Sequence, residues 1–385
     1  MNKLLNNLNE KLKEKLFSVK WKRRFTLLVI LVLAFVVLYY ISFKIGCVIT
    51  NDVPDGFSIT TNTLPASEEY SQHKKDPDEH SRDEETTFLT LAEWYTVFSY
   101  QEYAEFISHN KPSSFPYFRA ITQYWNSYCN GYTATKGNYN TNYGYHTMLV
   151  VIGTSFTVEY GLKGIYENTV GRITEFSSWQ TDEDKYIAQL HTRFGNWVPT
   201  DPFYNFPYEK ELIGLWSDVD FFGVPFIRKL ERRIFLSLET SIKGGYGWII
   251  KQLTKAAYGG PDEKVYVTLI ADKDDLKDSR IMIVENVSKG KYVVALPHYQ
   301  GFTDILPELA LNGVQFLDFA GNDEIMITLL IPKDWKYTLH GQVLYEMDVL
   351  TDKNLKQIAV KVYIKDVHMF LQNLHEAKLV HIFDY

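Results

Sequence analysis

The longest uninterrupted apolar run of the chain covers residues 25–43, FTLLVILVLAFVVLYYISF, nineteen residues without a charged side chain. At about 1.5 Å per residue, a helix of this length nearly matches a hydrocarbon core of about 30 Å. The run is too long for a strand, and it lacks the polar stripe of a helix buried in a soluble protein. The pattern therefore predicts one N-terminal transmembrane helix.

Basic side chains lie almost entirely on one side of this predicted helix. Seven Lys and Arg residues precede it between positions 11 and 24, and Lys44 alone falls within the twenty residues that follow. Cytoplasmic flanks carry such an excess of positive charge, and the run has no small-residue cleavage site after it. We therefore expect an uncleaved signal anchor in the cytoplasmic (inner) membrane of a bacterium, single-pass, with the N-terminus inside and the other domains outside.

The basic cytoplasmic flank, residues 1–24, has leucines at helical spacing beneath its lysines. This pattern fits a short amphipathic helix on the anionic inner leaflet. It fits equally well a flank that only fixes the topology. After the predicted span, residues 44–86 are rich in Pro, Ser, Asp and Glu and have almost no apolar periodicity, which predicts a flexible tether.

Residues 87–260 have the pattern of a mostly helical, aromatic-rich domain. Thr90 and Glu93 have the spacing of a capping box and predict a helix that begins there. Between Met148 and Ile173, small and polar residues recur along one narrow arc of a second predicted helix. Such an arc indicates close packing against a neighbouring helix, and we expect that neighbour within a bundle because the uncharged stretch, residues 147–158, is too short to span a membrane.

An aromatic segment followed by a basic helix is the candidate interaction surface of this domain. The predicted helix that begins at Ile227 has apolar residues on one side and cations on the other, and residues 228–258 hold seven basic and two acidic side chains. Two interpretations follow: the segment contacts the bilayer, with rings at the interface and cations on phosphates, or the apolar side faces the bundle core and the cations face water. The candidate residues for a lipid or partner surface are Trp216, Phe221, Phe222, Arg228, Lys229, Arg232 and Arg233.

Residues 261–385 change to β-rich runs interrupted by two predicted helices. The strand pattern at residues 292–296 recurs at residues 358–362, and residues 314–319 resemble residues 380–385, both at an offset of 66. Each copy reads strand, helix, strand. The expected fold class is therefore α+β with one N-terminal transmembrane helix, in which the helical region precedes a β-rich region with a duplicated βαβ arrangement that resembles a ferredoxin-like plait.

Composition excludes several classes of protein. With 45% hydrophobic residues in 385, the chain can bury a core, and its two cysteines cannot form a disulfide framework. The formal charge of −7 gives no attraction to nucleic acid. That value hides a split, because residues 1–24 hold eight basic and two acidic side chains and the remainder therefore carries −13.

No catalytic or cofactor motif that depends on local spacing is present: the sequence contains no phosphate-binding loop, HExxH, GxSxG, CxxC or GxGxxG. We predict no cofactor and no metal site, and the catalytic residues of any reaction stay unknown. One alternative keeps an enzyme in view, with an aromatic-lined pocket in the helical domain. Its candidate residues are Trp94, Tyr95, Glu102, Glu159, Lys163 and Tyr166, of which Glu159 and Lys163 have the i,i+4 spacing of a helical ion pair.

The functional expectation follows from these patterns taken together. A membrane anchor, a tether and an aromatic and basic segment without a catalytic motif favour a non-enzymatic, extracytoplasmic protein. We expect it to bind an envelope protein or an anionic lipid surface, and we do not expect a nucleic-acid partner.

Overall fold

The computed structural model describes residues 84–135, 139–177, 180–257, 264–335 and 341–384, together with Thr26. The predicted basic flank, the predicted span apart from Thr26, and the predicted tether up to residue 83 lie outside the described residues. Within the described part, helices come first and two four-stranded antiparallel sheets follow. The structure therefore confirms the mixed helix and sheet composition that the sequence predicts.

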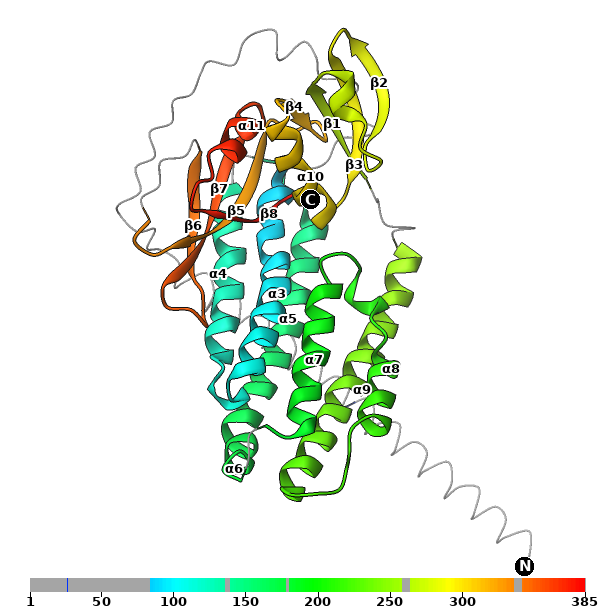
Figure 1. Ribbon diagram of the computed structural model, residues 1–385, viewed down its shortest axis with the longest axis vertical. Coiled ribbons are helices and arrows are strands. Elements are labelled where there is room, and N and C mark those ends of the chain that lie inside the picture. Colours follow the sequence, from blue (N-terminus) through cyan, green and yellow to red (C-terminus); the bar gives the residue numbers. More distant parts are fainter. Residues whose placement is uncertain are drawn as a thin grey trace, which may run out of the picture.

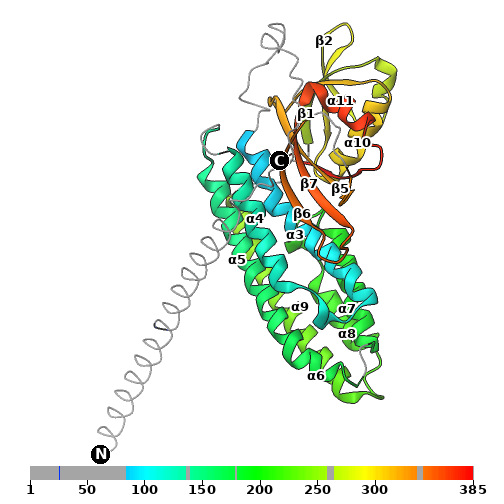
Figure 2. The ribbon, with the colours of Figure 1, turned by 90° about the vertical axis from the view of Figure 1, so that its left-hand side faces the viewer.

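The helices form an elongated bundle, and the sheets lie at one end of it (Figures 1 and 2). Residue 166, the last of α5, leads without a break through a π-helical turn, η2, into α6. The helical elements are α3 (Glu84–His109), η1 (Pro112–Ser114), α4 (Tyr117–Thr135), α5 (Tyr143–Tyr166), η2 (Glu167–Gly171), α6 (Arg172–Thr174), α7 (Asp182–Trp197), η3 (Phe203–Asn205), α8 (Tyr208–Ser217) and α9 (Phe226–Ala257).

The two sheets have the same strand order. In the first, the order is β2-β3-β1-β4, and in the second it is β6-β7-β5-β8, with every neighbouring pair antiparallel. The elements of the first sheet are β1 (Lys264–Ile270), η4 (Lys273–Leu276), β2 (Met282–Ser288), β3 (Lys291–Pro297), α10 (Gln300–Leu311) and β4 (Gln315–Phe319). Those of the second are β5 (Glu324–Pro332), β6 (Gln342–Asp348), β7 (Leu355–Tyr363), α11 (Ile364–Gln372) and β8 (Lys378–Ile382).

Register tests the offset that was read from the sequence. Thr268 of β1 and Thr328 of β5 serve as corresponding positions, because each stands just before the register shift between its strand and the last strand of its sheet. Thr268 faces Val293 of β3, and Thr328 faces Ala359 of β7, so β3 and β7 are 66 positions apart when the sheets are aligned on these threonines. The last strands are not, because Thr268 faces Asp318 whereas Thr328 faces His381, an offset of 63. The segment that holds α11 is thus three residues shorter than the one that holds α10, and the sequence match of residues 314–319 with residues 380–385 is out of register by three.

The second sheet joins the two parts of the molecule. On one face, Met326, Ala359 and Phe383 pack against Phe88, Leu91 and Trp94 of α3. On the other face, β5 and β7 share one hydrophobic core with α10, α11 and the first sheet. The Thr87 hydroxyl also donates to the Phe383 carbonyl oxygen at 3.0 Å. The bundle and the sheets are therefore packed together through a common apolar contact.

Two local predictions about the bundle have different outcomes. The capping box at Thr90 is wrong, because α3 begins at Glu84 and the Thr90 hydroxyl donates to the Thr86 carbonyl oxygen one turn earlier, at 2.7 Å. The expected close packing of the small-residue arc is present. A Cβ atom built on Gly153 would overlap the Tyr124 ring of α4, and one built on Gly164 would be too close to Tyr117.

The close approach of α4 and α5 at Gly153 predicts the effect of a methyl group there. In Gly153→Ala, the new Cβ would stand 2.1 Å from Tyr124 Cε1, so we expect a loss of about 1–3 kcal/mol in the free energy of unfolding. Gly245→Ala in α9 is the matched control, because nothing lies within 4 Å of its built Cβ, and it should gain about 0.5–1 kcal/mol. Urea unfolding of both variants in detergent measures these changes, and equal behaviour of the two would contradict the packing.

Candidate functional site

Helix α9 places its charged side inward and its apolar side outward. Arg228, Arg232 and Arg233 are each no more than 1% exposed, and Lys229 is 5% exposed. Ile242, in contrast, is 61% exposed. Both interpretations of this helix from sequence are therefore wrong in the same respect, because the four cations face neither lipid phosphates nor water. The apolar side chains of α9 that the sequence assigned to the bundle core, among them Ile234, Leu238 and Ile242, lie on the surface instead.

Carboxylates of the neighbouring helices hold these cations. Arg232 donates from both terminal nitrogens to the two oxygens of Glu167, each at 2.6 Å. Arg228 donates to Asp184 at 2.9 Å, and Arg233 to Glu183 at 2.8 Å. A planar guanidinium matches a carboxylate in this two-point manner. We call these residues, together with Glu159, Lys163, His191, Glu239 and Lys243, the buried ion-pair network.

The π-helical turn η2 shapes the centre of this network. It contains Glu167 and ends at Gly171, where a built Cβ would stand 2.4 Å from Glu167 Oε2 and 3.3 Å from Arg232 Nη2. Any side chain at this position would therefore occupy the space of the ion pair. The absent side chain of Gly171 is thus a condition for the contact between Arg232 and Glu167.

The second half of the network lies further along α5 and α9. Lys163 donates to Glu239 at 2.9 Å and to His191 Nε2 of α7 at 3.0 Å. Lys243 pairs with Glu159 at 2.7 Å and with Glu239 at 3.2 Å. The i,i+4 pair expected between Glu159 and Lys163 is thus replaced by partners on α9. Because the ion pairs run in opposite order along the two helices, α5 and α9 are antiparallel neighbours.

Burial also sets the protonation of His191. Its pKa is held well below the usual 6.5, first by burial and then by the neighbouring Lys163 ammonium, although Glu239 acts in the opposite direction. Burial likewise lowers the pKa of Lys163, with Glu239 opposing that shift. The imidazole is therefore neutral and accepts the hydrogen bond from Lys163.

The six residues predicted to form one pocket lie in three separate places. Trp94 stacks on His381 of the second sheet, with ring centroids 3.5 Å apart. The Tyr95 hydroxyl donates to Gln123 of α4, and Glu102 accepts from Thr351. Glu159, Lys163 and Tyr166 share the α5 side of the contact with α9, where Tyr166 stacks on Phe235 at 3.5 Å.

The aromatic members of the predicted surface lie differently from its cations. Trp216 and Phe222 are exposed, and Phe221 is half-buried. The Arg233 guanidinium lies 5.3 Å from the centre of the Trp216 ring and 4.9 Å from that of Phe221. These rings therefore cover a buried cation, a contact that is favourable in itself.

The outward sides of α5 and α9 together form a surface that we call the apolar face. Its members are Val158, Leu162 and Ile165 of α5 and Ile234, Leu238, Ile242, Trp248 and Ile249 of α9, all exposed. No charged side chain is exposed in residues 143–171 or in residues 226–250. An exposed apolar area of this kind marks an interaction site on a folded protein.

One helical stretch of the described residues is long and apolar enough to cross a membrane, Tyr143–Thr174, which includes α5. Buried side chains make up 44% of its most apolar window. A core helix of a soluble protein has the same length and composition. Length and composition are therefore weak evidence for a membrane span. The absence of exposed charges from residues 143–171 says more about the surroundings of this helix.

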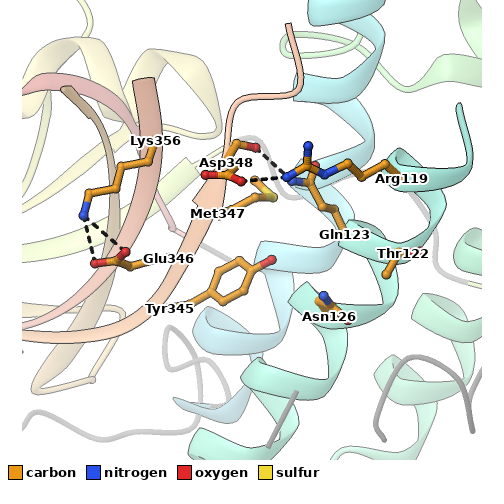
Figure 3. Close-up of a pocket in the computed structure, with 9 residues that line it drawn as sticks. All are labelled: Arg119, Thr122, Gln123, Asn126, Tyr345, Glu346, Met347, Asp348 and Lys356. Carbon is orange, nitrogen blue, oxygen red and sulfur yellow. Dashed lines mark hydrogen bonds and ion pairs between the residues drawn. The ribbon is translucent and has the colours of Figure 1, made fainter. Parts of the chain in front are cut away.

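A groove of about 330 Å³ lies between α4 and β6 (Figure 3). Arg119 pairs with Asp348 at one end, at 2.6 Å, and Lys356 pairs with Glu346 at the other, at 3.1 Å. The lining contains none of the residues predicted from sequence. It is formed by Arg119, Thr122, Gln123, Asn126, Tyr345, Glu346, Met347, Asp348 and Lys356.

Among the described residues, no group of three or more His, Cys, Asp or Glu side chains has the arrangement of a metal site. Comparison of the chain with protein-family models, with curated proteins and with solved structures gives no match. The function therefore has to be argued from the apolar face and the network beneath it.

The buried ion-pair network predicts a large difference between buried and exposed pairs. Arg232→Met leaves Glu167, itself 1% exposed, without its partner, so the free energy of unfolding should fall by about 3–5 kcal/mol. Lys185→Met is the control, since Lys185 and Asp182 form an exposed pair at 3.2 Å and should contribute less than about 1 kcal/mol. Adding Glu167→Gln to Arg232→Met should restore part of the loss, and a double variant as unstable as the sum of the single changes would contradict the pairing.

The neutral state of His191 predicts a pH dependence. Because its folded pKa is depressed below 6.5, the unfolded chain binds the proton more readily, and stability falls as the pH drops below that value. The slope contributed by one such histidine is up to about 1.4 kcal/mol per pH unit. His191→Asn should reduce the measured slope between pH 6.5 and 5 by that amount. An unchanged slope in His191→Asn would show that the imidazole is already charged.

Proposed function

We propose that this chain is a membrane-anchored protein whose body lies outside the cytoplasmic membrane of a bacterial cell and binds through the apolar face. The observation that carries the proposal is the reversal of α9, which turns seven charged side chains inward and leaves no exposed charge over residues 226–250. A surface without charge is poorly hydrated, so covering it releases water and favours association.

The proposal keeps the predicted anchor and changes the predicted chemistry of binding. Arg228 and Arg232 are engaged with carboxylates, so attraction between these two cations and an anionic surface is not the source of affinity. Contact through apolar side chains replaces it. The enzyme alternative is the weaker one, because its six candidate residues are distributed over three places and none of them lines the groove between α4 and β6.

We also propose that the two sheets are copies of one unit that contains a split βαβ, as in ferredoxin-like folds. Both β3 and β4 pair antiparallel with β1, so they run parallel with β1 between them, and β7, β8 and β5 repeat this arrangement. The identical strand order supports the duplication.

Thiol labelling in intact cells tests both the location and the binding surface. A cysteine in place of Gln189, exposed on α7, should react with a membrane-impermeant maleimide added from outside. A cysteine in place of Ile242, 61% exposed in the structure, should be protected until detergent is added, because a bound partner or lipid covers it. The unsubstituted chain, in which Cys129 is disulfide-bonded, is the control for labelling at any other position.

Each result has one interpretation. Labelling of Gln189→Cys only after permeabilisation would place the body inside the cell. Labelling of Ile242→Cys as fast as Gln189→Cys in intact cells would show that nothing covers the apolar face, and the proposed function would fail.

A further inference from the structure

We infer that the occupant of the apolar face is the phospholipid bilayer, and that α5 and α9 lie in the plane of its interface, between headgroups and acyl chains. This inference rests on the proposed function and names its partner. The apolar face is long. The stretch of α9 without an exposed charge covers residues 226–250, which is about 37 Å of helix, and α5 presents a similar stretch beside it.

The apolar face continues beyond the helices onto the end of the bundle that is remote from the sheets (Figure 1). There Ile173 and Phe176, after α5, and Val224 and Ile227, around the start of α9, are exposed, and Arg228 joins the two segments by donating to the Gly171 carbonyl oxygen at 3.2 Å. Phe176 is 97% exposed and Val224 is 98% exposed. A protein partner has to match these loops side chain by side chain, whereas acyl chains adapt to them without a specific fit.

The residues at the ends of these two stretches have the chemistry of a membrane interface. Arg172 follows the α5 stretch and Lys251 follows that of α9, and both are exposed. Because the helices are antiparallel, one cation lies at each end of the apolar face, within reach of lipid phosphates. Trp216 and Trp248 are exposed along it, and indole rings prefer the headgroup region.

The opposite side of the bundle excludes a transmembrane position for these helices. α7 packs beside α9 and exposes polar residues along its length, among them Lys185, Gln189 and Arg193. A bundle that crossed the bilayer would bring these side chains to hydrocarbon depth, at a cost of several kcal/mol each. Lying in the plane of the interface, the bundle keeps α7 in water and only α5 and α9 against lipid.

Photo-crosslinking in the full chain tests this assignment. The chain is reconstituted into vesicles of phosphatidylcholine and phosphatidylglycerol, with a benzophenone amino acid in place of Leu162 or Ile242, and the adducts are identified by mass spectrometry. We expect phospholipid adducts at both positions, about tenfold more abundant than at the control position Gln189 on α7, because only the former contact acyl chains.

The outcomes separate this inference from the proposed function. Equal lipid adducts at Ile242 and Gln189, or crosslinks between two copies of the chain in place of lipid, would overturn the bilayer as occupant. In the second case, protection of Ile242→Cys from maleimide would persist and the proposed function would stand with a protein partner. Loss of both signals would end both.

A second variant guards against an effect on folding. Leu238→Glu is at an exposed position (57%), so its helical circular dichroism and melting temperature should stay close to those of the parent chain. A carboxylate within the apolar face should reduce lipid adducts at Leu162 severalfold by raising the cost of contact with acyl chains. Unchanged adducts in this folded variant would contradict the inference.

Discussion

The two-point ion pair between Arg232 and Glu167 determines how α9 is rotated about its axis. Both side chains are 1% exposed, and their two hydrogen bonds join α9 to the π-helical turn after α5. Since α9 is amphipathic, fixing its charged side inward necessarily turns Ile234, Leu238 and Ile242 outward. The apolar face is therefore a geometric consequence of the network, and Gly171 allows both by leaving space for the carboxylate.

Such an arrangement is unusual for a protein surrounded only by water. Removing an ion from water costs several kcal/mol, and partners restore this only when the geometry is good and further hydrogen bonds are made. Here the guanidinium groups and carboxylates are paired, yet well-packed apolar residues could fill the same interior at no such cost. The arrangement has a clear physical advantage where the exterior is apolar too, because charges then belong inside the bundle and apolar side chains outside.

The sequence predicted the elements better than their orientation. The amphipathic pattern from Ile227 located α9, and the small-residue arc anticipated the close contact of Gly153 with α4. The same pattern could not show which side of α9 faces inward. A period of 3.6 residues defines an apolar face and a charged face, but it does not show which of them packs against the other helices. Glu167, Glu183 and Asp184, the partners that decide the matter, lie 44 to 65 positions away from their arginines.

The pocket predicted from sequence had the same weakness, because local spacing does not show which residues meet in space. Glu159 and Lys163 were paired with each other because they are four residues apart, whereas α9 supplies nearer partners in space. The sequence match at an offset of 66 does not extend to the last strands, because the segment between β7 and β8 is three residues shorter than the one between β3 and β4. Long-range contacts, and not local propensities, determine all of these features.

The central claim is that the outward side of α9 contacts lipid, and Trp248 reports on it directly. Its side chain is 65% exposed on the apolar face, so phospholipids brominated on their acyl chains should quench its fluorescence in reconstituted vesicles, because bromine quenches indoles only at short range. Comparison with Trp248→Phe isolates its contribution from those of the other tryptophans. The account predicts a quenched component that disappears in this variant. Equal fractional quenching of the two proteins would contradict it.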